Sequence, residues 1–206
     1  MKNNYRVAYD KGWQDLRLKE PADIARNMQV EYAVDKQQFI VPFLNENYIV
    51  DLAKETLVRE SDGEAPAIDA AILVLHYLSF FQSPAEVTGK WVSLKEIPNG
   101  GMLFYPAFHK EVICGLSRAY GQQTGIFPEC AAKLGGQPVT FGDVAARFSV
   151  FPKTPMCVAL WEGDEEVAAN ATVLYDPSIE YFLHIESIIG LGYYLARRLI
   201  KLAPQS

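Results

Sequence analysis

Residues 144–175 decide the fold, and they read VAARFSVFPKTPMCVALWEGDEEVAANATVLY. Three strand-like runs lie in this stretch, over Val144–Phe151, Met156–Trp161 and Val167–Tyr175. A short segment of glycine and acidic residues, 162–166, joins the last two runs, and such a turn is typical of an antiparallel hairpin. The stretch therefore predicts an antiparallel sheet with a C-terminal β-hairpin.

Helical patterns lie on both sides of this sheet in the sequence. Residues 66–81 are apolar nearly all round, which is typical of a helix enclosed by other elements. Residues 186–202 repeat leucine and isoleucine at three- and four-residue spacing, and a helix is also expected over residues 106–120. Strands in runs, with helices before and after, indicate an α+β fold. We expect a single domain over residues 1–206, with a helical N-terminal subregion in residues 1–30.

A second hairpin is predicted nearer the N-terminus. Apolar residues 39–44 and 48–50 are separated by Asn45-Glu46-Asn47, a turn-forming segment. Pro42 should lie at an edge or bulge, because proline has no N–H to donate to a neighbouring strand.

Composition excludes several classes of protein. The 206 residues include 19 basic and 25 acidic side chains, for a net charge of −6, and half of them are hydrophobic. This balance argues against disorder, and an acidic chain does not suit a general binder of nucleic acid or of anionic membranes. Early charges argue against a signal peptide, and no apolar run reaches the roughly 20 residues of a membrane helix. Three scattered cysteines do not form a disulfide framework, so we expect a cytoplasmic protein with reduced thiols.

Several catalytic signatures are incomplete. Thr88-Gly89-Lys90 has the end of a phosphate-binding loop, but Pro84 and Trp91 occupy the positions of its first glycine and its hydroxyl. The sequence has neither a Cys-x-x-Cys pair nor a Gly-x-Ser-x-Gly elbow. His109 and Cys114 are five residues apart, which is too far round an α-helix for a nucleophile and its base.

The acidic segment allows two interpretations. Glu162, Asp164 and Glu165 are candidate ligands of a divalent cation, or a candidate acid and base. Glycine and aspartate are also ordinary turn residues, and this interpretation is favoured, so that no metal is expected. A cation-dependent enzyme that uses these carboxylates remains the alternative.

Candidate ligand-binding residues are polar or aromatic side chains within apolar segments. His76 lies in the most apolar helix and needs a hydrogen-bond partner if it is buried. His109 and Tyr105 lie together near the start of another predicted helix. We expect His76 or His109 to be the titrating group of a ligand pocket. Trp91 and Tyr105 are expected to form aromatic walls of this pocket, and Lys90 and Arg147 to contact an anionic group of the ligand.

Four blocks of sequence resemble a known family. They include LHYL at 75–78 and TGKWVSLKEIPNGG at 88–101, followed by residues 142–155 and 160–183. These blocks are similar to the domain-of-unknown-function family numbered 3786, met mostly in anaerobic bacteria and archaea. The family has no established activity. The resemblance implies a link to anaerobic metabolism, because some relatives add a cysteine-rich iron–sulfur domain of the kind seen in corrinoid proteins.

Three functions are therefore expected in order of preference. The first is an accessory protein of anaerobic metabolism that binds a small ligand or cofactor of unknown identity. The second is the cation-dependent enzyme, and the third is an interaction module for an iron–sulfur or corrinoid protein.

Overall fold

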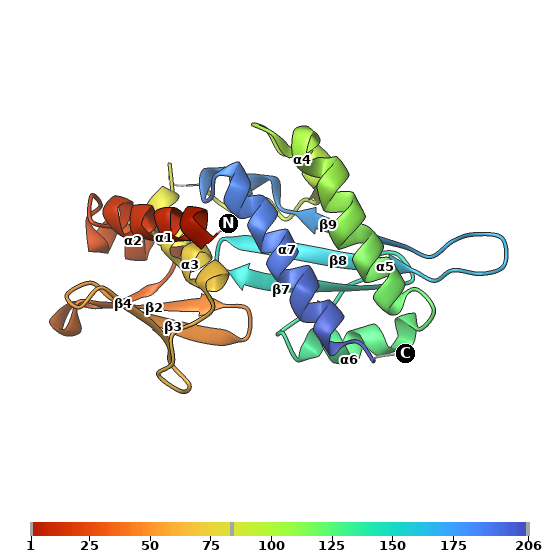
Figure 1. The fold of residues 1–206 in the computed structure, drawn as a ribbon, viewed down its shortest axis with the longest axis horizontal. Coiled ribbons are helices and arrows are strands. Elements are labelled where there is room, and N and C mark those ends of the chain that lie inside the picture. The colour runs from red at the N-terminus through yellow and green to blue at the C-terminus, as the bar shows by residue number, and fades with distance from the viewer. Residues whose placement is uncertain (1, 83–84, 205–206) are drawn as a thin grey trace.

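The computed structural model describes residues 2–82 and 85–204. It has an α+β fold, as predicted, with two antiparallel sheets and helices packed against them (Figure 1). Within the described residues, no helix is long and apolar enough to cross a membrane.

The first sheet has the order β1-β2-β3-β4. Its strands are β1 (Glu31–Ala33), β2 (Gln38–Phe43), β3 (Glu46–Asp51) and β4 (Thr56–Arg59). The antiparallel pairing of β2 with β3 confirms the predicted hairpin. Pro42 pairs with Asn47 of β3, whereas β1 reaches only as far as Ile40 along the other side of β2. No strand therefore needs the N–H that Pro42 lacks.

The second sheet has the order β5-β9-β8-β7-β6. Its strands are β5 (Val92–Ser93), β6 (Gln137–Pro138), β7 (Val144–Phe151), β8 (Thr154–Trp161) and β9 (Asn170–Tyr175). The strands β7, β8 and β9 pair antiparallel in chain order, as predicted. The connection from β8 to β9 is longer than the predicted tight turn, because β9 begins at Asn170 and not at Val167. Figure 1 shows this loop extending beyond the end of the sheet.

The observed helices differ from the predicted ones mainly over residues 101–120. They are α1 (Lys2–Leu16), α2 (Pro21–Met28), α3 (Ile68–Phe80), α4 (Gly101–Phe108), α5 (Cys114–Tyr120), α6 (Phe127–Ala132) and α7 (Ile185–Leu202). Short 3-10 segments cover residues 34–36, 94–96, 124–126 and 177–181. The helix expected to begin at Pro106 begins at Gly101, and a π-helical segment, His109–Ile113, joins α4 to α5.

Aromatic rings connect the two sheets with α3. The ring of Phe151 in β7 stacks on Phe43 of β2 with centroids 4.5 Å apart, and on Tyr77 of α3 at 4.3 Å. The Leu44 N–H donates to the carbonyl of Val150 at 2.8 Å, so the backbones of the two sheets also touch. The helix α7 runs across the second sheet with α4 and α5 beside it, which leaves its N-terminal end next to α3 (Figure 1).

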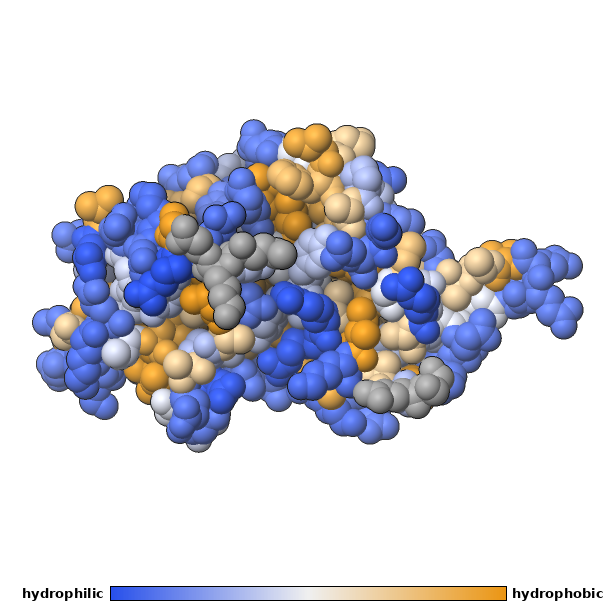
Figure 2. Space-filling view, in the orientation of Figure 1, coloured by the Kyte–Doolittle hydropathy of each residue, from blue (hydrophilic) through white to orange (hydrophobic). Residues whose placement is uncertain are grey.

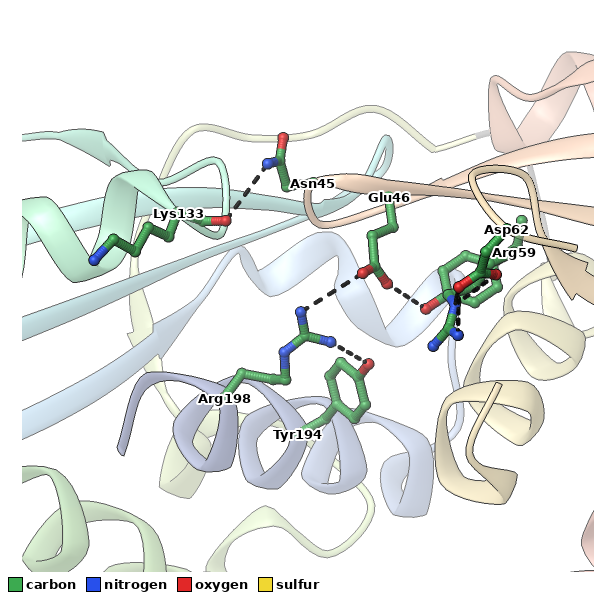
Figure 3. A network of polar contacts seen from close by, with 8 residues as sticks. Asn45, Glu46, Arg59, Asp62, Lys133, Tyr194 and Arg198 are labelled. Carbon is green, nitrogen blue, oxygen red and sulfur yellow. Dashed lines mark hydrogen bonds and ion pairs between the residues drawn. The ribbon is translucent and has the colours of Figure 1, made fainter. Parts of the chain in front are cut away.

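Polar contacts fix the other half of α7 to the first sheet (Figure 3). The Glu46 carboxylate accepts a hydrogen bond from the Tyr48 hydroxyl at 2.8 Å and lies 3.8 Å from an Arg198 nitrogen. Arg198 also donates to the hydroxyl of Tyr194, one turn earlier in α7, at 3.1 Å. These contacts hold α7 in place and thereby position its first turn.

Candidate functional site

A cleft lies where α1, α3 and the first turn of α7 meet. It has a volume of about 580 Å³ and adjoins a second hollow of about 590 Å³, and both share His76 and His184. Its walls combine apolar residues of α3 and α7 with a few polar groups, a composition typical of sites for small molecules.

His76 is held by a hydrogen bond to Ser187. Its Nδ1 atom lies 2.8 Å from the Oγ atom of Ser187. The backbone of Ala8 in α1 favours the protonated ring. We assign Nδ1 as the acceptor of the Ser187 hydroxyl hydrogen, so that Nε2 carries the ring hydrogen.

The environment keeps His76 neutral. Burial, followed by the nearby His184, lowers the pKa of His76 from 6.5 to about 4. The Ala8 backbone and the carboxylates of Asp15 and Glu186 act in the opposite direction but do not outweigh these two effects. At neutral pH the ring is consequently an unprotonated acceptor, which is the state required of a general base.

His184 completes the polar floor of the cleft. Its ring centroid lies 4.6 Å from that of His76, its Nδ1 atom lies 3.0 Å from a Glu186 oxygen, and its Nε2 atom lies 3.3 Å from the Ser187 hydroxyl. His184 is the N-cap residue of α7, and Ser187 lies in the first turn. Side chains of a helix tilt toward its N-terminus, so this turn directs both groups into the same hollow.

Charges at the rim of the cleft are mainly negative. Asp69 of α3 pairs with Arg197 of α7 at 2.9 Å, whereas Glu111 and Glu186 line the cleft without a Lys or Arg pair in the described residues. Tyr193 lies beside Glu111, and its pKa is raised by burial and then by that carboxylate. The rim therefore favours a neutral or positively charged ligand over an anion.

Of the sequence-predicted site residues, only His76 lies in this cleft. Tyr105 and His109 lie on the helix that runs from α4 into the π-helical segment, with ring centroids 5.7 Å apart. Lys95 stands over the Tyr105 ring at 4.3 Å. The exclusion of a His109–Cys114 pair was wrong: the Cys114 Sγ atom lies 3.7 Å from Nδ1 of His109, because these residues are separated by a π-helical turn.

Trp91 and Arg147 lie at the second sheet and not at the cleft. Trp91 packs on a small cluster that includes Cys157 and Leu174, and Arg147 is the direct partner of Cys157 in the β7–β8 pairing. Directly opposed residues share a face of a sheet, so Trp91 and Arg147 lie on the same face. Lys90 is exposed in the loop that precedes β5. The binding roles of these three residues stay predictions.

The loop of residues 88–89 serves a structural role. The N–H groups of Thr88 and Gly89 both donate to the Asp176 carboxylate, at 3.1 and 2.7 Å, and Ser178 donates to it as well. The pKa of Asp176 is lowered, since burial opposes ionisation but the hydrogen bonds from Ser178 and Thr88 outweigh it. Amides that a phosphate-binding loop would present to a ligand are therefore occupied by this side chain.

The acidic loop between β8 and β9 shows turn chemistry. Asp164 accepts hydrogen bonds from the N–H groups of Glu166 and Val167, at 2.8 and 2.7 Å, and these bonds lower its pKa. Glu162 accepts from the Thr124 hydroxyl at 2.9 Å, and Glu165 is exposed. No group of three or more His, Cys, Asp or Glu side chains in the described residues is arranged to hold a metal ion. A cation site at Glu162, Asp164 and Glu165 stays a prediction.

Sequence reasoning missed His184 and Ser187. His76 and Ser187 are 111 positions apart, and no local pattern indicates that such distant residues meet. The sequence offers one indication of these two residues. His184-Ile185-Glu186-Ser187 gathers three polar side chains at the start of the last predicted helix.

The comparison with protein families supports the resemblance seen in the sequence. The family model described as a domain of unknown function (DUF3786) matches residues 20–198. The chain belongs to this family. No curated protein and no solved structure matches the chain. The DUF3786 match contains His76, His184 and Ser187, whereas α1, which closes one side of the cleft with Tyr5 and Ala8, precedes it.

Proposed function

We propose that the protein binds a small organic molecule in the cleft between α1, α3 and α7. The observation that carries this proposal is the hydrogen bond from Ser187 to neutral His76, in the wall of a hollow large enough for such a ligand. Buried histidines usually satisfy themselves within the core, but this one faces a cleft together with a second imidazole.

The charge of the rim defines the class of ligand. Glu111 and Glu186 face a cleft whose one arginine, Arg197, already pairs with Asp69. Apolar side chains of Ile72, Leu73 and Tyr193 form much of the remaining wall. The ligand is therefore an amine or a neutral molecule with an apolar body, and the cleft discriminates against carboxylates and phosphates.

Three probes of one shape test this proposal: benzylamine, benzyl alcohol and benzoate. Saturation-transfer NMR should detect binding of benzylamine and benzyl alcohol, and benzoate should bind most weakly. Glu111→Gln and Glu186→Gln should each lower the affinity for benzylamine about two- to fivefold, as expected for partly screened charges. The affinity for benzyl alcohol should stay unchanged. His109→Asn is the matched control, because His109 is the one histidine outside the cleft. Equal binding of benzoate and benzylamine would contradict the assignment.

A second proposal concerns the partner implied by the family resemblance. We propose a cytoplasmic accessory role in anaerobic metabolism, with an iron–sulfur or corrinoid protein as partner. What supports an interaction is the first turn of α4, where Met102 and Leu103 are 65% and 77% exposed. Figure 2 shows hydrophobic residues at the surface in the region of α4. The tagged chain should capture, from an anaerobic host, a protein whose iron or cobalt content and absorption spectrum identify it. Leu103→Lys should abolish this capture, and capture of proteins without iron or cobalt would count against the proposal.

A further inference from the structure

We propose that Ser187 is a nucleophile for acyl transfer and that His76 is its general base, so that the cleft hydrolyses carboxylic esters of neutral or cationic compounds. This inference rests on the proposed ligand-binding cleft and adds a reaction to it.

The geometry is that of a nucleophile and its base. The Ser187 Oγ and His76 Nδ1 atoms are 2.8 Å apart, within the range required for proton transfer. The backbone of Ala8 favours the protonated ring, which is an effect that the carboxylate of serine hydrolases exerts with a larger charge.

The place of Ser187 in α7 favours the charge that develops during the reaction. Ser187 lies in the first turn of a helix of 18 residues, whose N-terminal end carries a partial positive charge. The N–H groups of Ser187 and Ile188 both donate to the His184 carbonyl, at 3.0 and 3.1 Å. Within the described residues the N–H groups of Ile185 and Glu186 have no backbone acceptor, so these two can interact with an anion. A helix N-terminus thus lies where an alkoxide and a tetrahedral oxyanion would form.

The reaction balances with water as the second substrate. Ser187 Oγ bonds to the carbonyl carbon of the ester while Nδ1 of His76 takes its proton. The bond from that carbon to the alkoxy oxygen then breaks, and His76 returns the proton to the leaving alcohol. Water attacks the acyl group on Ser187, His76 accepts a proton from this water and passes it to Ser187 Oγ, and the carboxylic acid leaves.

His184 is a positioning residue in this scheme. Its Nε2 and Nδ1 atoms lie 3.3 and 3.5 Å from Ser187 Oγ, both farther than Nδ1 of His76, and its Nδ1 atom also lies 3.0 Å from a Glu186 oxygen. His184 thus packs against the serine hydroxyl and lines the cleft beside it.

A fluorophosphonate probe, which bonds covalently to activated serines, tests the inference directly. Peptide mass spectrometry should find the label on Ser187. Ser187→Ala should abolish it, and His76→Asn should slow labelling at least a hundredfold, a typical contribution of a general base. His109→Asn and Ser178→Ala are matched controls and should retain the label, since Ser178 is equally buried but bonds to Asp176 outside the cleft.

The pH dependence distinguishes catalysis from a structural role. The groups that act on His76 are His184 and Glu186 from α7 and Asp15 from α1. Labelling should stay constant from pH 8 down to pH 5 and fall as pH approaches about 4, because only the neutral ring accepts the proton. Ser187→Cys offers a second test if Ser187→Ala does not fold: its thiol should react with iodoacetamide, and the added change His76→Asn should slow that reaction.

Substrate charge and ligand binding separate the two proposals. Among p-nitrophenyl esters, the 4-aminobutyrate and acetate should be hydrolysed, and the half-ester of succinate should be the poorest substrate. No label on Ser187 in a protein that binds benzylamine would overturn this inference and leave the proposed function intact. Labelled Ser187 with no benzylamine binding would overturn the ligand class, and failure of both would overturn both proposals.

Discussion

The Sγ atom of Cys114 lies 3.7 Å from the Nδ1 atom of His109, five residues earlier in the chain. In an α-helix these residues would point in widely different directions, at 3.6 residues per turn. Here the Cys114 N–H donates to the His109 carbonyl in a π-helical turn, which brings residues five apart into line. Pro106 lies one turn earlier inside the helix, where its missing N–H and its ring disturb the regular α-helical bonding.

This arrangement predicts one selectively reactive thiol. Under native conditions iodoacetamide should modify Cys114 well before the other two cysteines. Cys130 and Cys157 are buried, and burial raises the pKa of the Cys157 thiol to about 11. Thiol reactivity requires both access and the thiolate, so Cys157 lacks both. Peptide mass spectrometry over time gives the three rates, and His109→Asn should change the rate of Cys114 alone. Modification of Cys157 as fast as Cys114 would refute the prediction.

What could be predicted from the sequence depended on local signals. Apolar periodicity marked α7, and a strand-like apolar run marked β7. The longer loop after β8 escaped prediction, because the apolar Val167 continues the strand pattern although Asp164 binds its N–H. The cleft was mostly missed because aromatic and polar neighbours in sequence, such as Lys90 and Trp91, need not converge in space, whereas His76 and Ser187 meet only through tertiary packing.

Two glycines of α7 should respond very differently to alanine. A Cβ atom at Gly192 would lie 2.3 Å from the Tyr175 hydroxyl oxygen and 2.5 Å from a Phe108 ring carbon. Both neighbours are fully or almost fully buried and cannot move aside, so Gly192→Ala should cost about 1–3 kcal/mol, a typical cost of overpacking.

Gly190→Ala is the matched control for this prediction. Its Cβ atom would meet only the end of the Leu73 side chain, at 3.3 Å, and alanine favours the helix by about 0.5–1 kcal/mol. Urea unfolding should therefore place Gly190→Ala within about 1 kcal/mol of the original protein. Similar losses at both positions would show that helix packing at Gly192 is looser than its contacts indicate.

Asp176 should be a major anchor of the loop that leads into β5. Its carboxylate accepts from the N–H groups of Thr88 and Gly89 and from Ser178. In Asp176→Asn an NH₂ group replaces one acceptor oxygen and faces donors, so the N–H of Gly89, or those of Thr88 and Ser178, lose their acceptor. We expect a loss of about 2–4 kcal/mol in the free energy of unfolding. Asp143→Asn is the control, because Asp143 is exposed and, in the part of the chain that the structure describes, accepts only from the Glu162 N–H. This change should cost less than about 1 kcal/mol.

Replacing His184 should raise the pKa of His76. His184→Asn removes the neighbouring group that, after burial, lowers the pKa of His76, so this pKa should rise from about 4 toward 6.5 while burial still holds it below that value. NMR titration of the His76 ring protons measures the change. An unchanged His76 pKa in His184→Asn would assign the whole shift to burial.

The low pKa of His76 also predicts how stability depends on pH. Because this pKa falls from 6.5 in the unfolded chain to about 4 in the folded one, the unfolded chain binds the extra proton between these values. The contribution of neutral His76 to the free energy of unfolding is fully present above pH 6.5 and is lost as the pH falls toward 4. Its total is on the order of 3 kcal/mol. Urea unfolding from pH 7 to pH 4 should thus show a shallower decline for His76→Asn than for His109→Asn, in which His76 still titrates. Both variants share every carboxylate of the chain, so parallel curves would show that His76 is not held neutral by the fold.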